Sequence, residues 1–515
     1  MANVHTRRRG ARNARIAMRS SILEPMLPTL KHALSPVTAI TPEQILLIDD
    51  ASMSILENVG VIFRDPIAQQ DWREAGAKVE GNRIYVDRHH LRELIASIPS
   101  SINYTARNAA HSVAVGDNQA VFVPASGASF IRDLDDERRL ANLDDLNTMH
   151  KLAHLLPAMH STGHNIVDPN DIAVPHRHLH ITYSSMKYSD KMFMGMTTSG
   201  KNAQDVLAMC DILFGADFLE DHAVTTANIS GTSPLVYDET ILKALRQYVL
   251  RRQPVLCSPY TLAGSNTPSS TPAAIAQINA ETLAGLAYTQ VVRKGAPAIY
   301  GAYLSTLSMK TGQALVGTSE LSLMNYMLGQ MARHYGLPWR SSGGLAASKV
   351  LDAQAGYESA TTLMSAVNAG ANYIWQAAGW NEAGQQCSVA KFMADAEQCA
   401  MAYRMAAGVR WDDFDAALGA VADVGPAGRY FEHAHTLAHF EDAFAMPKLF
   451  DGQLFEQWQY DGEQDLTARA LSAAKALLEA YVEPELDPAI DEQLKAFVAK
   501  REREIDPDAG YNEEH

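Results

Sequence analysis

The stretch AIYGAYLS (residues 298–305), followed by GTSELSLMNYMLGQMARHY (317–335) and PWRSSG (338–343), contains the unit that decides the fold. Its first segment is a short, mostly apolar run, which is typical of a parallel strand covered on both faces. The second segment has the apolar spacing of an amphipathic helix. Gly336 and Pro338 then predict where this helix ends and the next strand begins. The unit is therefore strand, helix, strand.

The same unit recurs along residues 118–405. The predicted strands are apolar or β-branched runs, and they cover Val121–Ser126, Met159–Asn165, Lys191–Thr198, Thr225–Ser230, Pro254–Tyr260, Ala298–Ser305, Pro338–Gly343 and Asn372–Ala378. The predicted helices lie at 142–156, 172–188, 201–214, 238–251, 272–292, 317–335, 353–369 and 387–405. Since each parallel strand needs a helical crossover, this alternation predicts a closed (β/α)8 TIM barrel of the α/β class. An open doubly wound sheet is the alternative, but its first strand should be followed by GxGxxG, and PASGAS (124–129) follows here.

The predicted barrel, residues 118–405, is the catalytic part of a four-part chain. A basic arm (1–20) and an α+β extension (21–117) precede it, and a helical extension (406–515) follows. In the α+β extension we expect helices at 43–58 and 66–75. The segment AKVEGNRIYV (77–86) predicts a hairpin, with its turn at Gly81-Asn82.

Composition and charge narrow the function classes. The 515 residues are 47% hydrophobic and 20% charged, as in a globular protein, and the net charge of −16 disfavours nucleic acid and anionic membranes as partners. The exception is the segment 7–19, which carries six arginines and no acid. We expect no secretory signal and no membrane span, because no apolar run approaches the roughly 20 residues that a span needs. The cysteines are Cys210, Cys257, Cys387 and Cys399, whose spacing indicates reduced thiols in a cytoplasmic protein.

In a barrel, the catalytic groups come from the C-terminal ends of the strands and the loops that follow them. The polar and aromatic candidates at these positions are Ser126, His164, Thr197, Asn228, Ser230, Tyr260, Tyr303, Arg340, Ser342 and Gln376. They include no paired carboxylate, cysteine nucleophile or metal triad. Aromatic residues are frequent instead, and several facing the mouth would form a cage for a cation, although each could equally fill the core. Arg340 could hold a carboxylate on the same ligand.

Two histidine runs are candidate metal ligands. His176, His178 and His180 form an HxHxH run, and His433 with His435 forms HxH. Both runs fall in predicted helices, where residues two apart point in different directions, so we predict no metal site. His164, at a strand end, is the better candidate for the site, with a structural hydrogen bond as an equal alternative.

Motifs spread over the whole chain resemble those of one family. They are RRRGARNAR (7–15), GTSPL (231–235), INAETLAG (278–285), KGAPAIYG (294–301), GTSELSLMN (317–325), GLPWRSSGGLAASKVLDAQAGYE (336–358) and HAHTLAHF (433–440). In content and order they resemble the trimethylamine methyltransferase family. The resemblance implies a (β/α)8 barrel, often in a multimer. It also implies methyl transfer from an amine to the cobalt of a corrinoid carried by a separate protein, with no tightly bound cofactor in this chain.

The chain departs from the founding members of that family at two positions. Leu345 aligns with the position at which they carry pyrrolysine, and Ala347 replaces an acid found in many relatives. The chain therefore resembles the pyrrolysine-free members, which use quaternary amines such as glycine betaine. A quaternary ammonium already has a neutral tertiary amine as its leaving group. Attack by Co(I) on a methyl group then needs no general acid. It needs only that the protein binds the substrate and orients one methyl group toward the cobalt.

These considerations lead to a hypothesis for the site. Tyr260, Tyr303 and Trp339 are predicted to form the ammonium cage, and Arg340 or His164 to hold the carboxylate. The remaining predicted roles are orienting hydrogen bonds from Ser126, Asn228, Gln354 and Gln376, and an apolar floor at Leu345. Glu281, Glu320 and Glu358 recur in the motifs but lie in predicted helices, where capping or inter-helix hydrogen bonding is expected.

Two rival functions remain open at this level. One is a metal- or cofactor-dependent barrel enzyme, a hydrolase or lyase, which predicts a bound ion in the purified protein. The other is a betaine-binding paralogue without catalysis, which predicts ligand binding with no methyl transfer. A homo-oligomer is expected in each case, with the basic arm and the C-terminal helices as places for subunit contacts.

Overall fold

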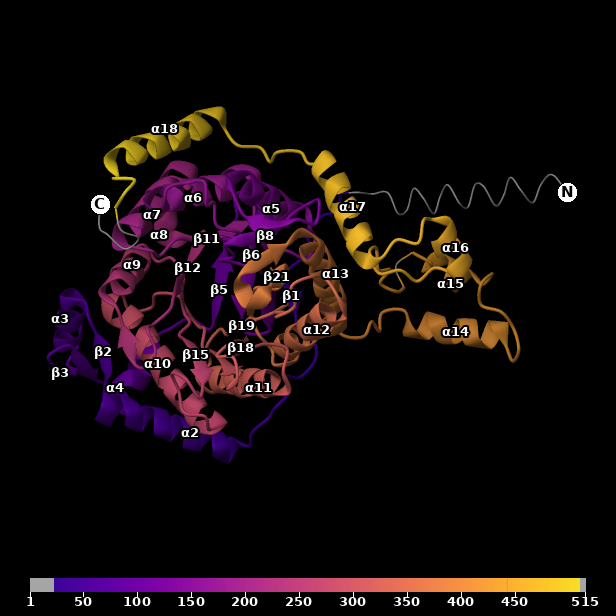
Figure 1. Ribbon diagram of the computed structural model, residues 1–515. Helices are drawn as coiled ribbons and strands as arrows, with labels where there is room; N and C mark the ends of the chain where they lie inside the picture. The colour runs from indigo at the N-terminus through magenta and orange to yellow at the C-terminus, as the bar shows by residue number, and fades with distance from the viewer. Residues whose placement is uncertain (1–22, 442, 510–515) are drawn as a thin grey trace.

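The computed structural model describes residues 23–441 and 443–509, and Figure 1 shows helices arranged around a central set of strands. The arginine-rich segment 7–19 lies outside the described residues. The parallel strands at the centre are β7 (Gln119–Phe122), β10 (Ser161–Gly163), β11 (Met192–Gly195), β12 (Thr225–Ile229), β14 (Val255–Cys257), β16 (Ala298–Tyr300), β19 (Arg340–Ser342) and β20 (Tyr373–Trp375).

Strand pairing closes these strands into a barrel. One parallel series runs β10-β11-β12-β14-β16 and another runs β19-β20-β7. A parallel bridge between Tyr300 and Trp339 joins β16 to β19. The backbone N–H of His160, just before β10, donates to the carbonyl of Phe122 on β7 at 2.9 Å and joins the remaining edges. The predicted (β/α)8 barrel is therefore confirmed.

Amphipathic helices cover the outside of the barrel. They are α5 (Leu143–Leu155), α6 (Arg177–Tyr188), α7 (Gly200–Phe214), α9 (Glu239–Leu250), α10 (Thr271–Val292), α11 (Ser319–His334), α12 (Ala353–Asn368) and α13 (Val389–Ala406). All eight predicted helices are confirmed, with ends that shift by a few residues. Several begin at a side-chain cap: Thr318 accepts from the N–H of Leu321, for example, and Asp352 from the N–H of Ala355.

The barrel interior has its own apolar core. Alternate residues of the strands point inward, so Met192 and Met194 belong to the inner cluster while Phe193 packs on the helices. The hairpin of β5 (Ser101–Tyr104) and β6 (Val113–Gly116) contributes Tyr104 and Val115 to the same inner cluster. Since β6 leads into β7, this hairpin plugs the N-terminal end of the barrel and leaves the C-terminal end as the mouth.

The structure splits two predicted strands. Pro254–Tyr260 becomes β14 and the start of β15 (Tyr260–Ala263), and Ala298–Ser305 becomes β16 and the start of β17 (Tyr303–Leu307). The two second parts pair with each other beyond the barrel wall, and β18 (Ala314–Leu315) adds to them. A small mixed sheet thus rises from the mouth and carries Tyr260 and Tyr303.

The N-terminal extension packs against the barrel helices. It contains α2 (Pro42–Ser54), a π-helical turn (Ile55–Val59), β2 (Val61–Phe63), α3 (Pro66–Glu74), β3 (Lys78–Glu80), β4 (Arg83–Tyr85) and α4 (Arg88–Ile95). The antiparallel β3–β4 pair is the predicted hairpin. The helix α4 and the β5–β6 plug were not anticipated from the sequence.

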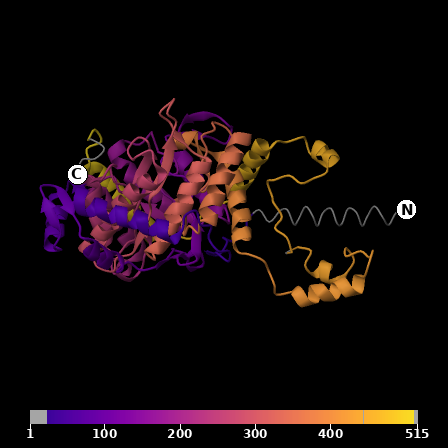
Figure 2. The same cartoon turned by 90° about the horizontal axis from the view of Figure 1, so that it is seen from below.

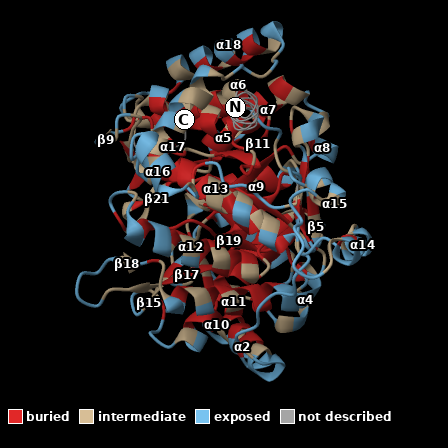
Figure 3. Ribbon diagram, turned by 90° about the vertical axis from the view of Figure 1, so that its right-hand side faces the viewer, coloured by how far each residue is buried: buried red, intermediate tan, exposed pale blue. Residues whose placement is uncertain are grey.

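The C-terminal part has two kinds of region. The helices α17 (Leu466–Glu479) and α18 (Pro488–Glu504) return to the barrel, whereas α14 (Phe414–Val424), α15 (Ala434–Ala438) and α16 (Phe455–Tyr460) stand away from it (Figures 1 and 2). Figure 3 colours the barrel centre as buried and much of the projecting helices as exposed. No helix in the described part of the chain combines the length and apolarity that a bilayer crossing requires.

Candidate active site at the barrel mouth

Arg340 is the central polar group of the mouth. It lies on β19, its residue is 4% exposed, and its guanidinium carbon lies 4.8 Å from the ring centre of Trp375 and 5.3 Å from that of Tyr303. Its Nη2 donates to Gln376 Oε1 at 3.1 Å, while its Nε is buried without a partner. Burial lowers the pKa of Arg340 to about 10, so the group stays charged at neutral pH.

No carboxylate of the described chain lies within ion-pair distance of Arg340. A buried charge is costly unless it is paired and hydrogen-bonded. Here the aromatic faces and one amide supply only part of that compensation. The site therefore holds a positive charge with spare donors, and a ligand carboxylate can accept two hydrogen bonds from it in a bidentate arrangement.

Gln376 holds Arg340 in place. Its carbonyl oxygen also accepts from Ser342 Oγ at 2.7 Å, so one amide joins β19 to the loop after β20. The backbone of Gln376 has φ of 56°, a left-handed conformation that non-glycine residues rarely adopt. Such strain is common at functional sites, where the surrounding structure maintains it.

An aromatic and apolar wall faces this polar group. Tyr260 and Tyr303 stack with ring centres 5.4 Å apart, as their register on β15 and β17 dictates. Tyr303 is nearly buried and Tyr260 is 44% exposed, so the pair runs from the interior to the solvent. Leu345 clusters with Tyr303, and Trp380 packs against the same cluster. The structure thus brings together three predicted residues, the two tyrosines and Leu345, beside Arg340.

Small polar groups surround the other strand ends. Ser258 Oγ donates to the side-chain oxygen of Asn228, and Ser126 Oγ contacts Asn165 Oδ1 at 2.9 Å and His164 Nδ1 at 3.4 Å. Burial lowers the pKa of His164, so its imidazole is neutral at pH 7. A separate hollow of about 410 Å³ lies at the residues that follow β11 and β12. Its lining is Arg64, Thr197, Thr198, Ser230, Asp238, Glu239, Thr240 and Ile241.

Two predicted residues lie elsewhere. The ring of Trp339 packs against Gly329 of α11, on the helix side of the barrel wall, so the structure does not place it with Tyr303. Gln354 is exposed in the first turn of α12, where it donates to Glu358 at 2.9 Å. The aromatic residue that does accompany Arg340 is Trp375, which the prediction omitted. The alternation along Tyr373, Ile374 and Trp375 could have indicated it.

Two mouth loops depend on a buried ion pair. Lys391 and Asp395 of α13 are 0% and 3% exposed, and their charged atoms lie 2.5 Å apart. Lys391 Nζ also donates to the carbonyl of Gly344, and Asp395 accepts from the N–H of Gly379. The pair thereby fixes the loop that carries Leu345 and the loop that carries Trp380. Sequence reasoning missed it because each residue looks like an ordinary helix-surface charge.

The glutamates of the motifs have structural partners. Glu281 Oε2 accepts from Ser233 Oγ at 2.5 Å, and burial raises the pKa of this carboxyl. Glu358 accepts from the N–H of Ala347 at 2.7 Å and so holds the loop after β19. Both contacts agree with the predicted hydrogen-bonding roles. Glu320 is exposed, and Ser319 Oγ approaches its carboxylate at 3.2 Å.

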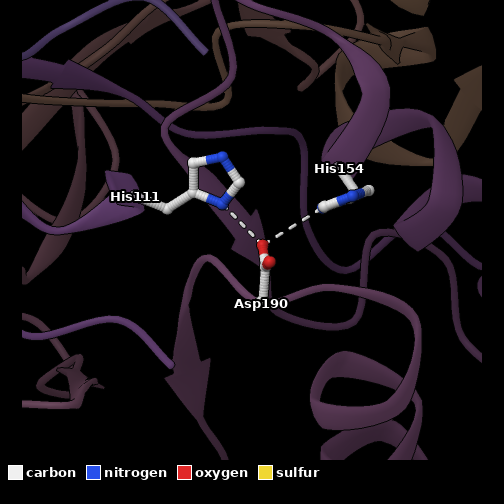
Figure 4. Close-up of side chains that lie close together, drawn as sticks. All are labelled: His111, His154 and Asp190. Carbon is white, nitrogen blue, oxygen red and sulfur yellow. Dashed lines mark hydrogen bonds and ion pairs between the residues drawn. The ribbon is translucent and has the colours of Figure 1, made fainter. Parts of the chain in front are cut away.

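Groupings of histidine and acid that could hold a metal ion lie away from the mouth. His111, His154 and Asp190 meet at the N-terminal end of the barrel, where both imidazoles point at one carboxylate oxygen (Figure 4). The other grouping, Asp413 with His435 and His439, is in the projecting C-terminal region. The HxHxH run does not converge: His178 pairs with Asp205, and His180 with Glu502.

Fold and mouth together have the form of a (β/α)8 barrel enzyme, with aromatic rings and a buried guanidinium at the C-terminal ends of its strands, where such barrels carry their active sites. The chain belongs to the trimethylamine methyltransferase family, whose model matches residues 7–506. It is 36% identical over 467 residues to glycine betaine methyltransferase of Desulfitobacterium hafniense (strain Y51), covering 90% of this chain and 97% of that protein.

Two further relatives show the breadth of the family. Trimethylamine methyltransferase MttB of D. hafniense (strain DSM 10664 / DCB-2) is 27% identical over 91% of this chain and 95% of its own length. Proline betaine:corrinoid methyltransferase of Eubacterium limosum is 25% identical over 90% of this chain and 98% of its own.

Proposed function

We propose that this chain transfers a methyl group from a carboxylated quaternary ammonium compound to the cobalt of a corrinoid carried by a separate protein. The observation that carries the proposal is Arg340, a buried guanidinium with spare donors and no acidic partner in the described chain. Two of the three relatives described above are named for betaines, which carry both a quaternary ammonium and a carboxylate.

The charge of the mouth favours a zwitterion over a simple cation. A ligand carboxylate on Arg340 neutralises the buried charge and satisfies its free donors. The ligand ammonium then lies among Tyr260, Tyr303 and Trp375, whose ring faces attract a cation by about 0.5–2 kcal/mol each. Choline or trimethylammonium lacks the carboxylate and would add a second positive charge beside Arg340. Repulsion thus contributes to specificity together with attraction.

The residues of the mouth explain how this chain would promote the transfer. When the methyl carbon leaves, the bonding electron pair stays on nitrogen and the product is a neutral tertiary amine, so no proton donor is required. Arg340 and the aromatic wall fix both ends of the ligand, and the apolar surface at Leu345 and Tyr303 excludes water from the ammonium. Positioning of this kind can lower a barrier by several kcal/mol. The reduced corrinoid supplies the nucleophile.

The proposal is tested by titration calorimetry with glycine betaine, proline betaine, carnitine, choline and trimethylamine. We expect binding of a carboxylated quaternary amine and no binding of choline or trimethylamine. Equal affinity for choline and the betaines would contradict the carboxylate role of Arg340. Absence of measurable binding for all five compounds would contradict the proposed substrate class.

A second measurement separates an enzyme from a binding protein. The ligand that binds is mixed with the chain and chemically reduced cobalamin, and methylation of cobalt is followed by its absorbance. We expect the change to require both the ligand and the chain. Binding without methylation, with free cobalamin or with a corrinoid protein, would favour the non-catalytic alternative.

A further inference from the structure

Two histidines at α15 and one aspartate at α14 direct their metal-binding atoms at one another. His435 lies in α15 and His439 directly follows this helix, so the two are four residues apart and share one helix face. Their Nε2 atoms lie 3.4 and 4.0 Å from Oδ2 of Asp413, the residue that precedes α14. The centres of the two imidazole rings are 4.8 Å apart. Two imidazoles and one carboxylate therefore converge.

The distances between these atoms match the spacing of ligands around a metal ion. Zinc binds histidine nitrogen at about 2.0–2.1 Å and carboxylate oxygen at about 2.0–2.2 Å, in tetrahedral geometry. Two ligand atoms of such a tetrahedron are about 3.4 Å apart. The separation of Asp413 from His435 has this value, and the longer separation of Asp413 from His439 needs a small movement of one ring. The group has room for an ion at its centre.

The histidine and aspartate grouping at the N-terminal end of the barrel lacks that room (Figure 4). His111 Nδ1 lies 2.5 Å from Asp190 Oδ1, which is a hydrogen-bond distance and leaves no space for an ion between the two atoms. Lys191 directly follows Asp190 and places a basic group beside this cluster. Of the two groupings, the one in the projecting C-terminal helices is therefore the better metal site.

Two of its ligand atoms have no competing structural use. An aspartate before a helix usually accepts from the backbone N–H groups of the first turn, but the carboxylate of Asp413 makes no such cap on α14. His435 Nε2 is buried and has no hydrogen-bond partner in the described part of the chain. An unsatisfied buried nitrogen is costly, and coordination to a metal would satisfy it.

His433 is not part of the group. Its Nε2 pairs with Asp423 at 3.5 Å, and its Nδ1 accepts from the backbone N–H of His435 at 3.2 Å. The spacing that forms the site is thus HxxxH and not HxH. The sequence prediction of no metal site considered residues two apart, whereas residues four apart lie on the same face of a helix.

The segment that carries the site has little apolar core. Residues 407–441 and 443–465, which contain α14, α15 and α16, stand away from the barrel in two perpendicular views (Figures 1 and 2). Among these described residues, Ala420 and Leu449 are the buried ones. A helix as short as the five residues of α15 is not stable in isolation. Small units without a sufficient core are commonly stabilised by a bound metal ion.

We propose that Asp413, His435 and His439 bind one divalent transition-metal ion, for which zinc is the best match, and that this ion holds α14 and α15 together. Imidazole nitrogen with one carboxylate is a ligand set of zinc, whereas magnesium and calcium prefer oxygen ligands alone. Three protein ligands leave one tetrahedral position for water. The site lies away from the mouth, and the inference does not depend on the proposed function.

The test measures zinc binding to the full chain, purified without a histidine tag and freed of metal with a chelator. Equilibrium dialysis with elemental analysis counts the bound zinc, and competition with a chromophoric chelator gives the Kd. The site variant is His435→Gln/His439→Gln. We expect one zinc per chain for the wild type and a Kd at least roughly a hundredfold higher for the site variant. Loss of a group that merely orients a metal ligand already costs about 10–100-fold in affinity.

Two control variants match the site variant. His433→Asn changes the neighbouring histidine and keeps a residue type that caps helices, and His111→Gln changes the other grouping. Both should bind zinc as the wild type does. A wild type that binds no zinc would overturn the proposal, as would a site variant with the wild-type Kd or loss of the zinc in His111→Gln. Unchanged circular dichroism of the site variant would show that its barrel is folded.

Limited trypsin digestion of the wild type gives a second readout that needs no substitution. Arg429 is exposed and lies between α14 and α15. If an ion joins the two helices, zinc should slow cleavage after Arg429 in the metal-free wild type, and a chelator should restore the original rate. The site variant should be cleaved at the same rate with and without zinc. Cleavage of the wild type that does not respond to zinc would contradict the structural role of the ion.

Discussion

Lys191 and Arg340 are buried basic side chains at opposite ends of the barrel, and their surroundings differ. Burial lowers the pKa of Lys191 to about 7 and that of Arg340 to about 10. Lys191, just before β11, is 3% exposed and donates to the carbonyls of Ala153, Leu156 and Met159 at 2.7–3.1 Å. Arg340, at the mouth, makes one such hydrogen bond and keeps a buried Nε without a partner. A buried amine whose hydrogen-bonding capacity is fully used stabilises the fold, whereas a guanidinium with spare donors is available to a ligand.

The residues around the two basic groups differ in the same way. Around Lys191, Asp190 accepts from His111 Nδ1 at 2.5 Å and from Asn108 Nδ2 at 3.1 Å, which ties the N-terminal extension to the barrel (Figure 4). Around Arg340 lie ring faces and one shared amide. The first arrangement is closed by hydrogen bonds within the chain, and the second is left open toward the mouth.

The largest expected effect is on stability, from Lys191→Met. This change leaves three buried carbonyls without their donor, and each unsatisfied group costs about 1–3 kcal/mol. We expect the free energy of unfolding, measured by urea denaturation, to fall by about 3–5 kcal/mol. Ligand affinity at the mouth, measured below the unfolding transition, should stay within about twofold. A large loss of affinity with intact stability would reverse the assignment of the two ends.

The next effect is on binding, from Arg340→Met. Truncating one partner of a buried charge pair costs about 2–5 kcal/mol, so we expect the Kd of the carboxylated ligand to rise roughly a hundredfold. Stability should be unchanged or higher, because an incompletely compensated buried charge is removed. Calorimetry and urea denaturation of the same preparation check both. If affinity for trimethylammonium compounds without a carboxylate fell equally, the carboxylate role would be wrong.

The smallest expected effect is a loss of stability at acidic pH, which arises at the N-terminal end of the barrel and not at the mouth. Burial, with a further contribution from the charge of Lys191, lowers the pKa of His154 to about 4. The folded pKa is below the unfolded value of 6.5, so the unfolded chain binds a proton first on acidification. The stability linked to His154 is present above pH 6.5 and is lost as the pH falls toward 4, by about 1–2 kcal/mol after allowance for its partial exposure.

Asp190 extends this acid sensitivity to lower pH. Burial alone would raise its pKa, but hydrogen bonds and charge from His111 outweigh it and lower the pKa to about 2. Its contribution is present above about pH 4 and is lost as the pH falls toward 2.

His154→Gln should make thermal stability less dependent on pH between about pH 6.5 and 4. Ligand binding at the mouth should not change from pH 6.5 to 9, since Arg340 titrates at about 10. A steep change in affinity over that range would contradict this.

The structure confirms much of what local patterns predicted. The helix and strand alternation produced the barrel, because periodicity and end signals are local and belong to each element separately. The same reasoning located Tyr260, Tyr303, Arg340 and Gln376 near strand ends, and these residues do meet. Their functional roles stay predictions, as does the division of the chain at residues 20, 117 and 405.

Trp339 shows why the orientation of each side chain at the mouth could not be predicted from local patterns. It is the neighbour of Arg340 on β19, and successive side chains of a strand point to opposite faces. If Arg340 faces the barrel interior, Trp339 must face the helices, and its contact with Gly329 agrees. The sequence prediction put both residues at the mouth. A one-residue change of register exchanges the two faces of a strand, and register depends on neighbours far away in the chain.

The barrel, the family and the types of residue at the strand ends could be predicted from sequence, since they depend on local periodicity, on caps and on motif order. Tertiary structure alone decided which aromatic residue accompanies Arg340, and that this cation lacks an acidic partner in the described chain while Lys191 uses its donors on three carbonyls. It alone also separated the exposed helices α14, α15 and α16 from the helices packed on the barrel. Each of these properties is a relation between distant segments, which burial and hydrogen bonding establish only when the chain is folded.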